Sequence, residues 1–167
     1  MSKLSSSSHH SRKHTITTGP FLVPFDAPSG GNNNRLIILI KNPTNRPLEA
    51  DIVIEFSEIP QFSIEGITLP FLTTLKEEPF LEGIGPTTIR PKSILRLEVD
   101  ITNDQNAVFH VNSTGDYLVG DDRPLRGKLE IEVVGGEGLI APTNAGLISA
   151  DPSLTFHYGD FVVYTRD

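Results

Sequence analysis

The sequence predicts an all-β protein: a single β-sandwich, of jelly-roll or immunoglobulin-like layout, behind an extended N-terminal connector segment. Apolar residues alternate with polar ones in several stretches, which is typical of strands with one buried face. In addition, 14 Gly and 13 Pro in 167 residues interrupt the chain too often for long helices. Because there is no Cys, core packing must hold the fold without disulfides. We expect the connector over residues 1–18 and the β-sandwich domain over residues 19–167.

The N-terminal stretch differs in charge from the rest of the chain. Residues 1–18 contain three Lys or Arg and no acidic residue, whereas the remaining residues contain 11 basic and 21 acidic side chains. Four consecutive serines and few apolar residues are typical of an extended, solvated segment. The stretch lacks the apolar run of a secretory signal. We therefore expect synthesis in the cytosol without a signal peptide.

Two strands are expected early in the domain. Residues 36–40 are continuously apolar, which indicates a central strand covered on both faces or a strand facing another subunit. Residues 52–56 alternate, and the turn-forming run 42–47 separates the two strands. Four prolines break the region 57–90, which we expect to form an elaborated connection with one or two short strands.

The second half predicts further strands. Residues 94–101 and 128–134 alternate regularly, and we expect both to present an aliphatic face to one core. Residues 154–158 alternate in the same way. Residues 161–164 are continuously apolar and predict another central strand or a strand that faces another subunit.

Several short motifs suggest chemistry but have simpler interpretations. Asp121 and Asp122 precede Arg123-Pro124 and are expected to form a turn, since neither calcium-loop spacing nor a spaced second carboxylate is present. Residues 135–138 lack the Lys and Ser/Thr of a phosphate loop and predict a hairpin connection. His9, His10 and His14 have spacings that suit a metal on a helix, but they lie in an extended segment without a nearby carboxylate.

No catalytic constellation is visible in the sequence. His110 and His157 are expected on exposed or mixed strand faces, and no nucleophile elbow accompanies them. We therefore expect a protein that is not an enzyme, with no catalytic residue, no metal ion and no cofactor.

Composition also limits the partners. A net charge of −7 and a pI near 5.2 argue against nucleic acid or an anionic membrane as the main partner. No apolar run approaches the roughly 18 residues that a membrane span needs. One alternative is a carbohydrate- or protein-binding β-sandwich module, although there is no Trp, and Tyr117, Tyr158 and Tyr164 do not cluster in the sequence. A phage or virus structural protein is another alternative.

Four motifs follow one another in an order that is similar to that of a known protein family. They are Gly19-Pro20-Phe21-Leu22-Val23-Pro24, Lys41-Asn42-Pro43-Thr44-Asn45-Arg46-Pro47, Thr88-Ile89-Arg90-Pro91-Lys92-Ser93 and Val162-Val163-Tyr164-Thr165-Arg166-Asp167. In this the chain resembles cysteine-poor β-sandwich proteins of spore-forming Firmicutes, and it is similar in layout to subunits of endospore appendage fibres. The resemblance implies a jelly-roll body, a connector that inserts into the next subunit, and a final location on the spore or cell surface. The lack of Cys departs from appendage subunits that cross-link through disulfides.

These observations predict a structural subunit that self-assembles head-to-tail into a filament or fibre, with copies of itself as partners. The N-terminal segment is expected to dock on a neighbouring subunit by β-strand addition, with apolar side chains in pockets and basic ones against the acidic body. Removal of residues 1–18 is then expected to leave a folded monomer that cannot assemble. The expected interface residues are Lys3, Leu4, Arg12, Lys13, Ile16, Phe21 and Val23.

Overall fold

A computed structural model of the chain describes residues 12–24, 32–58, 86–101, 107–137 and 151–164. These residues form β-strands and one short 3-10 helix, η1. No helix in these ranges is long and apolar enough to cross a bilayer. The elements are β1 (His14–Leu22), β2 (Arg35–Asn42), β3 (Leu48–Glu58), β4 (Thr87–Ile89), β5 (Ser93–Asp100), β6 (Ala107–Gly115), β7 (Leu118–Gly120), β8 (Arg123–Leu125), β9 (Glu130–Glu137), β10 (Asp151–Phe156), η1 (Tyr158–Asp160) and β11 (Val162–Tyr164).

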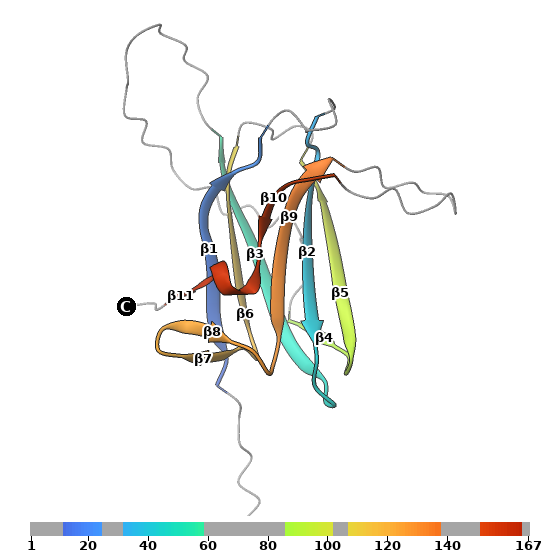
Figure 1. Cartoon of the computed structure of the whole chain (residues 1–167), viewed down its shortest axis with the longest axis vertical. Helices are drawn as coiled ribbons and strands as arrows, with labels where there is room; N and C mark the ends of the chain where they lie inside the picture. The colour runs from blue at the N-terminus through green and yellow to red at the C-terminus, as the bar shows by residue number, and fades with distance from the viewer. Residues whose placement is uncertain (1–11, 25–31, 59–85, 102–106, 138–150, 165–167) are drawn as a thin grey trace, which may run out of the picture.

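Two antiparallel sheets form the layers of a sandwich, which confirms the predicted all-β class (Figure 1). One sheet has the strand order β11-β1-β6-β3-β4, and the other has the order β10-β9-β2-β5. The hairpin β7–β8 forms a small third sheet. Every strand pair in the described residues is antiparallel. Because the two sheets share one core, each main strand has one face toward the other sheet and one face outward.

The core lies between the two sheets. Phe21 of β1 bridges them, because its ring centroid is 6.1 Å from that of Phe109 in β6 and 4.8 Å from that of Phe156 in β10. Tyr117 is fully buried, and its hydroxyl and that of Ser113 are 2.7 Å apart, so the polar end of this large side chain is satisfied inside the core. Burial of a large apolar side chain in this core stabilises the fold by about 1.5–3 kcal/mol.

The expected central strand at residues 36–40 is part of β2, which lies between β9 and β5. Leu36, Ile38 and Ile40 have no exposed surface. The strands expected at 94–101 and 128–134 correspond to β5 and β9 and lie in the same sheet, but β2 separates them.

The C-terminal strand is not the central strand that one interpretation of residues 161–164 predicted. β11 is a three-residue edge strand paired only with β1. Val162 and Tyr164 are 55% and 47% exposed, whereas Phe161 is buried. A continuous apolar run therefore has one face outside the core here, because no described strand or loop covers it.

Two of the expected turns have different outcomes. Asp121 and Asp122 connect β7 to β8 with φ of 51° and 59°, the conformation that a two-residue hairpin requires and that Asp tolerates. The hairpin connection expected at residues 135–138 is wrong, because Gly135 and Gly136 lie within β9. A Cβ on Gly135 would lie 3.1 Å from a methyl carbon of Val23, so the glycine admits close packing at this point.

Candidate functional site

Three of the seven residues expected to dock on a neighbour, Ile16, Phe21 and Val23, lie instead in the core of their own domain. β1 pairs with β6 on one side and with β11 on the other, so the expected boundary at residue 18 falls inside a strand of the sandwich. Ile16, Phe21 and Val23 are 0%, 8% and 4% exposed. These side chains already pack in the core of their own chain, and the described part of the expected connector belongs to β1 from His14 onward.

The basic candidates have different positions. Lys13 forms an ion pair with Glu49 of β3, and this hydrogen bond raises the pKa of Lys13 above its usual value. Both side chains are more than one-third exposed, so the pair contributes little stability. Arg12 is exposed, whereas Lys3 and Leu4 lie outside the described residues. Among the seven candidates, only Arg12 and Lys13 are thus described as surface residues.

A polar cluster on the outer face of the five-stranded sheet was not predicted from the sequence. The hydroxyl of Thr17 is 2.6 Å from Nε2 of His110, and Nδ1 of His110 is 2.8 Å from a carboxylate oxygen of Glu55. The cluster joins β1, β6 and β3. No local motif announces it, because 93 positions separate Thr17 from His110 and 55 separate His110 from Glu55.

A hydroxyl, an imidazole and a carboxylate in this order resemble the arrangement that activates a nucleophile. The environment of Thr17 favours a structural role. Thr17 is only 5% exposed, and its oxygen accepts a hydrogen bond from the amide of Gly19 at 3.2 Å. Gly19 has φ of 71°, and the register between β1 and β6 shifts between Thr17 and Pro20. We interpret the cluster as the contact that holds this β-bulge in place.

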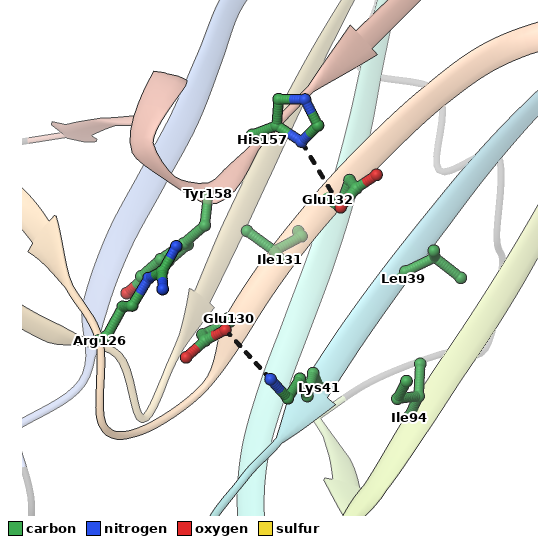
Figure 2. Close-up of a pocket in the computed structure, with 9 residues that line it drawn as sticks. All are labelled: Leu39, Lys41, Ile94, Arg126, Glu130, Ile131, Glu132, His157 and Tyr158. Carbon is green, nitrogen blue, oxygen red and sulfur yellow. Dashed lines mark ion pairs between the residues drawn. The ribbon is translucent and has the colours of Figure 1, made fainter. Parts of the chain in front are cut away.

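A pocket of about 270 Å³ lies on the outer face of the four-stranded sheet (Figure 2). β9 contributes Glu130 and Glu132, β2 contributes Lys41, and the segment at η1 contributes His157 and Tyr158. Its remaining lining residues are Leu39, Ile94, Arg126 and Ile131.

Two polar contacts cross the pocket wall. Lys41 Nζ forms an ion pair with a carboxylate oxygen of Glu130 at 3.6 Å. His157 Nδ1 is 3.7 Å from a carboxylate oxygen of Glu132, a contact that is an ion pair only when the imidazole is protonated. The hydroxyl of Tyr158 donates a hydrogen bond to the carbonyl of Leu125 at 3.2 Å, which fixes the ring at the edge of the pocket. The pocket therefore combines charged groups of both signs with an anchored aromatic side chain.

The tyrosines, which do not cluster in the sequence, partly do so in the fold. The ring centroids of Tyr117 and Tyr158 are 6.3 Å apart. Burial, and secondarily the charge of Glu130, raises the pKa of Tyr158 to about 12, and burial also raises the pKa of Tyr117. Tyr158 is therefore an uncharged hydrogen-bond donor at any physiological pH.

Alkaline titration is expected to reveal the raised pKa of Tyr158. The neutral phenol is favoured in the folded state, while an unfolded tyrosine ionises near its model value of 10.0. The folded protein then binds more protons between about pH 10 and about pH 12, so stability should fall as pH rises through this window. The measurement is tyrosinate absorbance against pH, with Tyr158→Phe as the comparison. The difference between the two curves isolates the step that belongs to Tyr158, which we expect near pH 12. A difference centred near pH 10 would contradict the assignment.

The histidines do not form a metal site within the described residues. No group of three or more His, Asp or Glu side chains there has a geometry suited to a metal ion. His14 begins β1, and its pKa is lowered by burial and by the positive charges of Arg12 and Lys128. His9 and His10 lie outside the described residues.

No family model, curated protein or solved structure matches this chain. The features of the described residues that bear on function are the strand edges, the polar cluster and the pocket. Of these, the strand edges bear on assembly, because they expose main-chain hydrogen-bonding groups.

Proposed function

We propose that the chain is a structural subunit that self-assembles head-to-tail into a filament, with the N-terminal segment of one copy added as a strand to the next copy. The resemblance to endospore appendage subunits supports this function and a place on the spore or cell surface. The docking residues of the proposal differ from those expected from the sequence, because Ile16, Phe21 and Val23 are buried within their own domain. In the proposal, the N-terminal segment docks through main-chain hydrogen bonds to an open strand edge and not through the side chains of these three residues.

The open edge of β5 is the feature of the structure that best supports this proposal. Its eight residues pair with β2 in unbroken register, and no described strand pairs with its other side. The strand contains neither a proline nor a bulge, two devices by which proteins block pairing at an edge. Arg96 and Glu98, its central charged side chains, form an ion pair with each other. A regular open edge of this length suits the addition of a strand.

The hydrogen-bonding direction along β5 follows from one contact. The amide of Ile101 donates to the carbonyl of Asn34, at the end of the β2–β5 ladder. Because successive residues of an antiparallel strand direct their main-chain groups to opposite sides, the amides of Leu95, Leu97 and Val99 face β2. The amides of Ile94, Arg96 and Glu98 consequently face the open edge.

The N-terminal segment has the length and charge to occupy this edge. Thirteen extended residues reach at most about 45 Å, whereas an eight-residue strand is about 27 Å long. Lys3 and Arg12 are basic, and the body from residue 19 onward has an excess of acidic side chains. Since strand addition relies on main-chain groups, the scarcity of apolar residues before His14 does not prevent it.

Removal of residues 1–11 is expected to abolish filaments and leave a folded body, because β1 begins at His14. The measurement compares full-length and shortened protein by electron microscopy and size-exclusion chromatography at equal concentrations. Filaments formed equally well by the shortened protein would overturn the connector role. A full-length protein that stays monomeric at every concentration would overturn the function itself.

An Arg96→Pro variant tests the acceptor edge. Proline removes an amide that faces the open side and leaves the ladder to β2 intact. Arg96→Ala is the matched control, because it removes the same charge and retains the amide. We expect filaments from Arg96→Ala but not from Arg96→Pro, with both variants folded by circular dichroism. Equal assembly of both would exclude β5 as the acceptor.

A further inference from the structure

The pocket on the outer face of the four-stranded sheet is close in size to a ligand site and is lined by charged and apolar groups. Its volume of about 270 Å³ lies just below the roughly 300–1,000 Å³ of pockets for drug-sized molecules. Such a volume suits one small ring. The wall is assembled from β2, β5, β9 and the segment at η1, so regular elements hold most of it in place.

The charged groups of the pocket keep free hydrogen-bonding capacity. Glu130 and Glu132 alternate along β9, which places both on its outer face. Their contacts with Lys41 and His157, at 3.6 and 3.7 Å, are longer than hydrogen bonds, so both carboxylates retain acceptor positions. Within the described part of the chain, Arg126 has no hydrogen-bond or ion-pair partner, and its guanidinium adds unused donors.

Apolar surfaces border these groups. Figure 2 shows Arg126 and Tyr158 at one end of the pocket and Leu39 and Ile94 at the other, with Glu130 between them. Ile94 is 62% exposed, so its side chain is accessible to a ligand. The Tyr158 ring is held by its hydrogen bond to Leu125.

The charge balance selects the class of ligand. Two carboxylates offset Lys41 and Arg126, so the pocket as a whole favours a neutral ligand. A phosphate group would meet the repulsion of Glu130 and Glu132, and a wholly apolar ligand would desolvate four charges without compensation. A ring with hydroxyls at its edge and C–H groups on its faces fits this lining. Its hydroxyls can form hydrogen bonds with the charged groups, and its C–H groups can pack against the apolar ends of the pocket.

We propose that this pocket binds a neutral monosaccharide unit. Vicinal hydroxyls would donate to Glu130 and Glu132 and accept from Arg126, while the ring packs beside Tyr158 or Ile94. None of the groups that would hold the sugar belongs to the N-terminal segment, although Ile94 lies on β5, the proposed acceptor strand. A protein without residues 1–11 leaves the edge of β5 open, so it should bind the sugar even where no filament forms.

Saturation-transfer NMR on the full-length protein tests the proposal, because the method detects weak binding to large assemblies. The probes are free glucose, galactose, N-acetylglucosamine and rhamnose, each to about 50 mM, a concentration chosen for the weak affinity of small ligands. We expect signal transfer to the ring protons of at least one sugar. Absence of transfer to all four would overturn the proposal.

Variants show whether the pocket is responsible. Glu132→Gln and Arg126→Ala are each expected to weaken binding at least about tenfold, because the sugar leaves polar groups unpaired. Asp122→Asn is the matched control, since it removes one carboxylate from an exposed turn outside the pocket. Circular dichroism establishes that all three variants fold. Unchanged binding in both pocket variants, or stronger binding of glucuronate than of glucose, would overturn the assignment to a neutral sugar in this pocket.

Discussion

An Ile131→Asp substitution is expected to unfold the domain. Ile131 is 1% exposed and faces the core from β9, so the variant buries a carboxylate without a partner. This costs several kcal/mol, a large part of the roughly 5–15 kcal/mol that stabilises a typical domain. Thermal unfolding followed by circular dichroism is the measurement, and we expect either a greatly lowered Tm or no cooperative transition.

Ile94→Asp is the matched control for this experiment. The same chemical change falls on β5, where Ile94 is 62% exposed, so its carboxylate stays in water. Its Tm should remain close to that of the unchanged protein. Equal melting of the Ile131 and Ile94 variants would show that the inner face of β9 has been assigned wrongly.

Removal of residues 1–18 is expected to prevent folding, in contrast to the outcome that the sequence predicted. The deletion removes all of the β1 residues that pair with β11, including Ile16, which has no exposed surface. It also removes Thr17 and leaves His110 without its hydroxyl partner. A cavity of the size of Ile16 alone costs about 2–5 kcal/mol, and the lost strand pairing adds to this.

The shorter deletion separates folding from assembly. Removal of residues 1–11 leaves β1 complete, so its circular dichroism spectrum and Tm should match those of the full-length protein. Removal of residues 1–18 should give a random-coil spectrum or aggregates. A cooperative transition at an unchanged Tm after the longer deletion would show that the first part of β1, including Ile16, does not contribute to the core.

β1 shows why the domain boundary was missed. Alternation places residues separated by even numbers on one face of a strand, yet Ile16 and Phe21 both face the core. The bulge between Thr17 and Pro20 supplies the extra residue that makes this possible. The charge and serine content of residues 1–18 predict a solvated tail. Because the bulge interrupts the period of two, no alternation indicates a strand there.

β6 and β5 show how well the alternation of apolar and polar residues predicts burial. In β6, Phe109 and Val111 occupy the core although the sequence did not single this strand out. In β5, Leu95 and Leu97 alternate as regularly as the residues of β9 but are only partly buried, because β5 is an edge strand. Alternation indicates which face is apolar, whereas position within the sheet decides how deeply that face is buried.

By itself the sequence determined the all-β class, the central strand at residues 36–40 and the turn at Asp121 and Asp122. Each of these depends on the backbone preferences or polarity of neighbouring residues. Only the tertiary structure decided that β1 belongs to the sandwich, that Thr17, His110 and Glu55 meet, and that a pocket forms beside Tyr158. These features join residues that lie far apart in the chain. Their partners are selected by strand pairing and core packing, which no local pattern specifies.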